Sequence, residues 1–125
     1  MAKETADHLI VGNDYERAFH IQNAEEDTAI NIAGYTLSYM IKRRKSDADL
    51  AAIVTKTTTL GIVIAGAFDA DPDVNAQRAT VSVSDTDTES LTPGLAYYEL
   101  KRTTAGFETV LAYGPVDLAR GVHRA

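Results

Sequence analysis

Most of the residues between Ala79 and Tyr113 alternate between apolar and polar side chains, a pattern that predicts short strands rather than a long helix. Ala79, Val81 and Val83 are separated by a threonine and a serine, which is the two-residue repeat of a strand with one buried and one solvated face. The Pro-Gly pair at 93–94 is a turn signal, because proline presets φ and glycine accepts a positive φ.

The second half of this region predicts a β-hairpin. Residues 96–102 place Ala96, Tyr98 and Leu100 on one face. The Ala-Gly pair at 105–106 supplies a tight reversal, and residues 107–113 form the returning strand. A strand, a Pro-Gly turn and a hairpin together indicate half of an antiparallel sandwich.

Two earlier segments alternate in the same way and carry the β-branched and aromatic residues that favour strands. The first is residues 15–22, with inward positions at Tyr15, Phe19 and Ile21. The second is residues 35–42, with one face formed by Tyr35, Leu37, Tyr39 and Ile41.

Three shorter segments complete the set. Residues 61–66 are aliphatic between two glycines, and we expect a buried strand there. Residues 48–52 are compatible with a helical turn or with the start of the strand that includes Ile53. Residues 85–90 could hold one helical turn. About seven to nine short strands with turn residues between them predict an all-β sandwich.

The chain of 125 residues is long enough for one domain and too short for two. We expect three parts: an N-terminal arm over residues 1–11, a sandwich over residues 12–118 and a polar C-terminal tail over residues 119–125. Hydrophobic residues make up 45% of the chain, but alanine supplies much of this share and tryptophan is absent, so the core should be thin.

The composition excludes several classes of function. With 18 acidic and 12 basic residues the formal net charge is −6, which disfavours binding to nucleic acid through its phosphates. The lack of cysteine excludes disulfides and thiolate metal sites. No apolar run approaches the roughly 20 residues that span a bilayer, and no apolar secretory segment begins the chain, so we expect a soluble protein made in the cytoplasm without a membrane partner.

Neither a catalytic site nor a metal or cofactor site is expected. His8, His20 and His123 lie far apart in the sequence, whereas such a site needs several converging groups. The acidic run Asp69–Asn75 resembles a calcium loop, but Val74 replaces the glycine that the loop needs at its sixth position. A solvated acidic loop is therefore favoured over an adventitious cation at a subunit contact.

Two short segments are candidates for binding a partner. The first is the isolated apolar run Leu9, Ile10 and Val11, which could add a strand to a neighbouring subunit. Like the C-terminal tail over residues 119–125, which is a further candidate, this run is expected to be ordered only in an assembly. Truncation of residues 1–11 would then abolish partner binding and leave the fold intact. The second is the basic run Lys42, Arg43, Arg44 and Lys45 at a strand end, for which a solvated terminus or edge guard is favoured over a salt bridge to a neighbouring subunit.

Five segments in this order resemble a widespread family of tailed-phage structural domains. The segments are Gly12–Ile21, Thr28–Leu37, Gly61–Ile64, Ala79–Thr88 and Leu91–Leu100. The family comprises the immunoglobulin-like β-sandwich modules of baseplate upper proteins, fibre-attachment domains and small head or neck proteins. The likeness covers about residues 10–118. This chain departs from the family at Ala96, where a further aromatic residue is frequent, and in lacking a long C-terminal stem.

The resemblance implies an immunoglobulin-like antiparallel sandwich that acts as a non-enzymatic part of a virion. Its expected partners are other virion proteins, namely capsid, neck or baseplate subunits, and further copies of itself. Head decoration and a tail or baseplate adaptor remain open, and the family has no catalytic residues to carry over. The alternative from another class is a carbohydrate-binding or adhesion module that uses a tyrosine face, which would expose Tyr97 and Tyr113 beside acidic groups. An enzyme would need a pocket in which a histidine and carboxylates converge.

Overall fold

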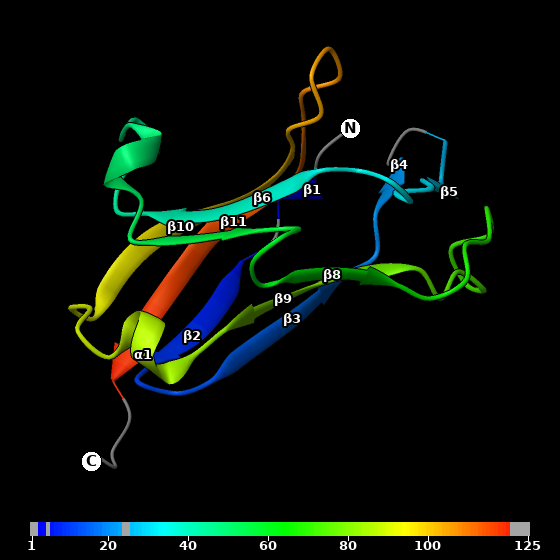
Figure 1. Ribbon diagram of the computed structural model, residues 1–125. Coiled ribbons are helices and arrows are strands. Elements are labelled where there is room, and N and C mark those ends of the chain that lie inside the picture. Colours follow the sequence, from blue (N-terminus) through cyan, green and yellow to red (C-terminus); the bar gives the residue numbers. More distant parts are fainter. Residues whose placement is uncertain (1–2, 5, 24–25, 121–125) are drawn as a thin grey trace.

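The computed structural model describes residues 3–4, 6–23 and 26–120 and shows two β-sheets packed face to face (Figure 1). The larger sheet has the order β1-β11-β10-β6-β7, and β2 also pairs with β11. Its strands are β1 (Lys3–Glu4), β2 (Asp7–Val11), β6 (Leu37–Lys42), β7 (Val54–Thr57), β10 (Gly94–Arg102) and β11 (Thr109–Arg120). The smaller sheet has the order β3-β9-β8, with strands β3 (Tyr15–Phe19), β8 (Ile62–Ala65) and β9 (Arg78–Val83).

The remaining elements are short. A two-stranded ribbon joins β4 (Gln22–Asn23) and β5 (Thr28–Ala29). The helical elements are the 3₁₀ turn η1 (Asp49–Ala51) and the single-turn helix α1 (Asp85–Thr88). Within the described ranges, no helix has the length and apolar character to cross a membrane.

The strand order is that of an immunoglobulin-type sandwich, which confirms the predicted fold class. β3, β9 and β8 take the places of strands B, E and D in one sheet, while β11, β10, β6 and β7 take the places of G, F, C and C′ in the other. The chain crosses between the sheets from β3 to β6, from β7 to β8 and from β9 to β10, so that the core is closed by contacts between distant parts of the chain.

The buried faces agree with the alternation in the sequence. Leu37, Tyr39 and Ile41 of β6 are fully buried, as are the small residues of β9 and the predicted inward face of β10. At the centre, the rings of Phe19, Tyr39 and Tyr98 lie about 6 Å apart, the separation of favourable aromatic contacts. Three large rings from both sheets thus fill a core that is otherwise built of aliphatic and small residues.

The predicted N-terminal arm is wrong where the structure describes it. β2 pairs in parallel with β11, with Leu9 opposite Leu118, and the Leu9 side chain is only 1% exposed. β1 also pairs with β11 in parallel, whereas the other pairings between the named strands are antiparallel in the described chain. Because the partner of β2 lies at the far end of the chain, the local pattern around Leu9 could not show that this run belongs to the core.

β11 is longer than the sequence predicted at its C-terminal end. It continues through Gly114 and Pro115, and Ala119 and Arg120 pair with β2, so the expected tail begins inside a strand. Residues 121–125 lie outside the described part of the chain. β1 pairs with β11 before Gly114, and β2 pairs with it after Pro115. Pro115 therefore lies between the two pairings, a position that tolerates a residue without a backbone N–H.

β8 is an edge strand rather than the predicted buried strand. Ile62 is buried, but Val63 is 63% exposed because only one face of β8 packs against the core. The two glycines that bracket β8 both have a positive φ, +101° at Gly61 and +94° at Gly66. A Cβ on Gly66 would lie 2.0 Å from the carbonyl oxygen of Ala76, so no other residue fits there.

The turn between β9 and β10 holds the helical turn that the sequence allowed. The Ser84 hydroxyl accepts a hydrogen bond from the Asp87 backbone, and the Asp87 carboxylate accepts one from the Ser84 backbone, which together form a capping box. Lys56 of β7 forms an ion pair with Asp87 at 2.8 Å. α1 is thereby attached to the edge of the opposite sheet.

We expect Asp87→Asn to lower the free energy of unfolding by about 1 kcal/mol at neutral pH, because it weakens the capping box and the partly exposed ion pair. The hydrogen bond from Lys56 and then the Ser84 backbone hold the pKa of Asp87 below its usual range. A depressed folded-state pKa stabilises the protein fully above the unfolded value of about 3.9, and this stabilisation is lost as pH falls through the folded value. Urea unfolding from neutral to acid pH should therefore show the free energies of unfolding of the wild-type and Asp87→Asn proteins becoming equal. Asp85→Asn is the control, and a difference that persists in strong acid would contradict the assignment.

Candidate functional site

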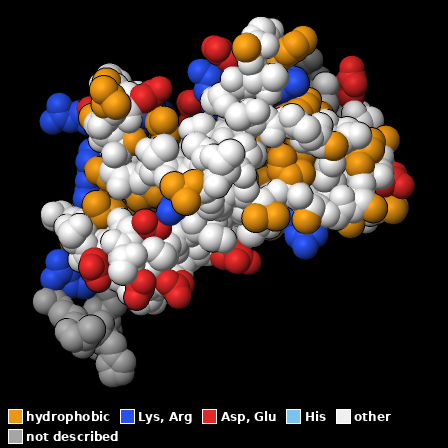
Figure 2. Space-filling view, in the orientation of Figure 1, with side chains coloured by type: hydrophobic (Ala, Val, Ile, Leu, Met, Phe, Trp, Pro, Cys, Tyr) orange, Lys and Arg blue, Asp and Glu red, His pale blue; other side chains and the backbone are white. Residues whose placement is uncertain are grey.

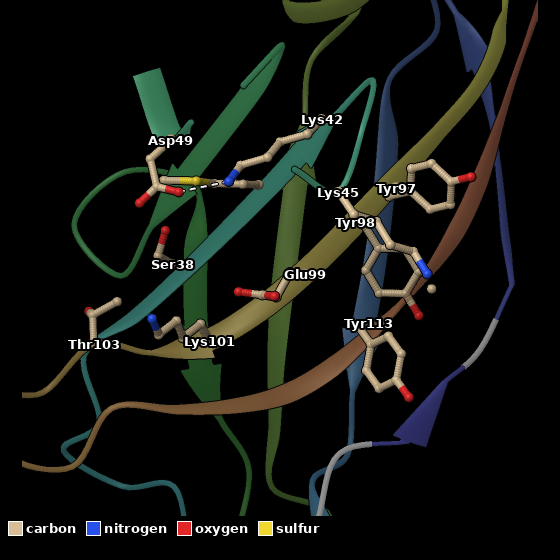
Figure 3. Close-up of a pocket in the computed structure, with 12 residues that line it drawn as sticks. Ser38, Lys42, Lys45, Asp49, Tyr97, Tyr98, Glu99, Lys101, Thr103 and Tyr113 are labelled. Carbon is tan, nitrogen blue, oxygen red and sulfur yellow. Dashed lines mark hydrogen bonds and ion pairs between the residues drawn. The ribbon is translucent and has the colours of Figure 1, made fainter. Parts of the chain in front are cut away.

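A groove of about 280 Å³ lies on the outer face of the larger sheet, across β6, β10 and β11 (Figure 3). Strand alternation creates it: the repeat that turns Tyr39 and Tyr98 into the core turns Met40 and Glu99 outward. We call this surface the outer groove. Its volume is just below the usual range of small-molecule sites, about 300–1,000 Å³.

The strand register arranges the floor of the outer groove in three rows. Ser38 lies opposite Lys101, Met40 opposite Glu99, and Lys42 opposite Tyr97. Tyr113 of β11 extends the middle row, because it pairs with Glu99. Successive rows on one face of a strand are about 6.8 Å apart, so the floor is roughly 14 Å long.

The loop after β6 forms one wall of the outer groove. Lys42 Nζ lies 2.7 Å from Asp49 Oδ1 and donates a hydrogen bond to the carbonyl oxygen of Asp47. The hydrogen bond from Lys42 lowers the pKa of Asp49, which keeps this carboxylate charged. Lys45 Nζ lies 5.1 Å from the centre of the Tyr97 ring, a cation–π contact that holds the loop over the sheet.

Figure 3 shows how the side chains divide the outer groove. Glu99 lies in the middle, Lys101 and Thr103 lie toward one end, and Tyr97 and Tyr113 lie toward the other. The two tyrosines are half-buried and Glu99 is exposed. The groove therefore offers aromatic rings, hydroxyl groups and charges of both signs to a single ligand.

The basic run Lys42–Lys45 does not form one cationic patch. Lys42 and Lys45 line the outer groove, whereas the Arg43 guanidinium donates to the carbonyl oxygen of Thr92 in the turn before β10. The backbone N–H of Arg44 donates to Asp47, and the Arg44 residue is exposed. The other predicted partner-binding residues, Leu9, Ile10 and Val11, are placed in β2, where they pair with β11 of the same chain.

A second candidate surface is the free side of β8. We call Leu60 together with Ile62–Ala65 the β8 edge. β8 is terminal in the smaller sheet, and Leu60 and Val63 are 68% and 63% exposed. Figure 2 shows hydrophobic side chains gathered at this end of the molecule, at the right of the view. Among the edge strands of the two sheets in the described chain, β8 alone carries no charged residue.

A polar cluster that the sequence did not predict lies between the sheets. Arg17 Nη1 forms an ion pair with Asp7 Oδ2 at 2.9 Å, and the Tyr15 hydroxyl also donates to this carboxylate. The Arg17 guanidinium packs over the Phe19 and Tyr98 rings at 4.5 and 5.0 Å from their centres. Burial, with the Asp7 hydrogen bond, raises the pKa of Tyr15 far above its usual value, so this phenol stays protonated. The cluster attaches β2 to β3 across the core.

The groups that sequence reasoning considered for catalysis or metal binding are held in local contacts. His8 lies 3.4 Å from Asp117, and His20 hydrogen-bonds the Gln77 carbonyl oxygen; neither lines the outer groove. In the acidic loop, Asp69 and Asp71 each accept a hydrogen bond from a backbone N–H two residues further on. His123 lies outside the described residues. Over the part of the chain that the structure describes, no three metal-ligating side chains gather.

The sequence contained only part of the signal for the outer groove. Tyr97 and Tyr113 could be singled out as candidate platform residues, but Glu99, Lys101 and Ser38 look like ordinary solvent-facing strand positions. Their convergence depends on the register between β6, β10 and β11, which pairs residues about 60 positions apart in the case of β6 and β10. A groove built on register has no signature in a single strand.

No protein-family model matches the chain, and no curated protein matches it.

Proposed function

We propose that this chain is a non-enzymatic structural protein of a tailed-phage virion, which assembles with capsid, neck or tail and baseplate subunits through its sheet edges. Two observations support the proposal. Five segments across residues 10–118 resemble phage sandwich modules, and the strands adopt an immunoglobulin-type order. The β8 edge supplies the surface on which the proposal rests.

The β8 edge is suited to pairing with another chain. An edge strand presents unpaired backbone N–H and C=O groups, and proteins usually guard such edges with charges, proline or bulges. β8 has none of these guards, whereas β2, β3 and β7 each carry charged residues. An apolar edge strand without charges is expected where a strand of another subunit pairs with it in an assembly.

Val63→Lys should weaken assembly at least about tenfold and leave stability unchanged, because the side chain is exposed in the free subunit but would carry a charge into the pairing surface. Ala18→Lys is a matched control: Ala18 and Val63 both lie opposite Thr80, on the same outer face but on different strands. Light scattering of the purified chain, and its incorporation into particles, measure the effect. Equal loss in both variants would place the contact on the sheet face, and no loss in either would exclude the β8 edge.

Quantitative mass spectrometry of purified phage particles tests the virion assignment itself. On the order of hundreds of copies per particle indicate the head, and about six or twelve indicate the symmetric neck or baseplate. Absence of the chain from purified particles would overturn the virion assignment.

The outer groove favours a second candidate function, a carbohydrate-binding or adhesion module. Tyr97 and Tyr113, both half-buried, lie in one groove with the exposed carboxylate of Glu99. Tyrosine rings offer a rigid apolar face with a polar tip, and a neighbouring carboxylate accepts hydrogen bonds from hydroxyl groups. Binding of glycans to the immobilised chain tests this candidate, and binding that survives Tyr113→Ala would contradict it.

A further inference from the structure

The unpaired charges of the outer groove point to the chemistry of its ligand, an inference that rests on the second candidate function. The ion pair between Lys42 and Asp49 is internally neutral. Lys45, Glu99 and Lys101 then remain, and within the described residues none of the three forms an ion pair. The groove thus has one excess positive charge in a chain of formal net charge −6.

The three charged groups have distinct positions along the outer groove. Lys45 is held over the Tyr97 ring at one end, and Lys101 lies one row beyond Glu99 toward the other end. Lys101 is also close enough to Asp49 to contribute to the lowering of its pKa. Glu99 lies between the two lysines and beside Tyr113, its partner on β11. A ligand in the groove meets a carboxylate at its centre and an ammonium group at each end.

We propose that the outer groove binds an acidic saccharide, with a sugar ring placed against Tyr113 and its carboxylate directed to Lys101. The flat apolar face of the ring contacts the tyrosine, and the ring hydroxyls donate to Glu99 and exchange hydrogen bonds with Ser38 and Thr103. Glu99 repels the ligand carboxylate and so fixes its orientation toward a lysine.

The same features argue against a phosphate ligand. A phosphate group carries about −1.5 to −2 charges, whereas the groove has a single excess positive charge and a carboxylate at its centre. The lysines that line the groove lie at opposite ends of it and do not converge on one point where a phosphate group could bind. A single carboxylate on a hydroxyl-rich ring matches the charge and the size of the groove.

Calorimetric titration of the full chain with galacturonic acid, which carries one carboxylate, and with the neutral galactose tests the proposal. We expect the acidic sugar to bind more tightly, and its affinity to fall with added salt. Lys101→Gln should weaken acidic binding about threefold to fivefold, in keeping with a partly exposed ion pair, and Glu99→Gln should strengthen it about threefold. Tyr113→Ala should weaken both sugars about tenfold. Arg44→Gln is the matched control, because it removes one positive charge from the same loop outside the groove.

The outcomes separate the two levels of the proposal. Equal binding of both sugars, or no effect of Lys101→Gln, would overturn selectivity for acidic sugars and leave carbohydrate binding in place. Binding of neither sugar would overturn both. Thermal unfolding of each variant shows that the fold is retained, which is expected because these side chains lie on the solvent face of the sheet.

Discussion

A chain that lacks residues 1–11 is expected not to fold. The deletion removes Leu9, which is 1% exposed in the core, and Asp7, the ionic partner of Arg17. Loss of a buried leucine side chain costs about 2–5 kcal/mol, and removal of one member of the partly buried ion pair adds about 1–3 kcal/mol for the polar group left without its partner. These two losses alone reach the lower part of the total stability of a small domain, about 5–15 kcal/mol. The deletion also leaves the C-terminal half of β11 without its outer partner.

Circular dichroism and two-dimensional NMR of the truncated chain measure this effect. Leu9→Ala in the full chain is the milder comparison and should remain folded at reduced stability. A synthetic peptide of residues 1–14 should restore the native spectrum when added to the truncated chain, because it supplies β1 and β2 to the open side of β11. A truncated chain with native spectra and an unchanged melting temperature would contradict the role of β2 in the core.

Asp7→Asn and Arg17→Met should each cost about 1–3 kcal/mol of unfolding free energy, while the double variant should cost clearly less than the sum of the two. Asp7→Asn retains an acceptor for the Tyr15 hydroxyl but leaves the guanidinium without a counter-charge among Phe19 and Tyr98. Arg17→Met keeps an apolar stem in that place and leaves the carboxylate uncompensated. Removal of both charges abolishes the unpaired state, so the coupling should be at least about 1 kcal/mol.

Urea unfolding of the four proteins in this cycle gives the coupling directly. Lys42 and Asp49 form the comparison pair, because their ion pair is of similar length but Asp49 is exposed to solvent. Its coupling should be much smaller. Additive effects of the Asp7 and Arg17 substitutions would show that the two side chains contribute to the core independently, and that packing of Arg17 on the aromatic rings matters more than its charge.

The two proposed surfaces use separate parts of the sandwich. The β8 edge belongs to the smaller sheet, and the outer groove lies on the far face of the larger sheet. A subunit that assembles through β8 therefore keeps its outer groove open to solvent. Val63→Lys and Tyr113→Ala should for this reason affect assembly and ligand binding independently.

Much of the candidate site was beyond the reach of sequence reasoning. The basic run Lys42–Lys45 was a visible feature, but its side chains separate in space: two line the outer groove, and Arg43 turns to Thr92. Arg17 was equally visible as a residue, yet nothing local shows that a charge at a strand position will be buried against Asp7. The position of each charged side chain depends on the groups that it bonds, and those groups belong to other parts of the chain.

The sequence alone determined the fold class and which face of β6, β9 and β10 is buried, because the two-residue alternation of apolar side chains is a property of each strand by itself. It also determined the turn at α1 and the glycines at both ends of β8, which depend on backbone conformation within a few residues. Only the tertiary structure decided that β2 joins the sheet in parallel, that β8 is an edge, and that Tyr97, Glu99 and Lys101 share a groove with Tyr113 and Ser38. These features depend on which strands become neighbours and in what register, and hydrogen bonds between strands distant in the chain leave no periodic trace in either one.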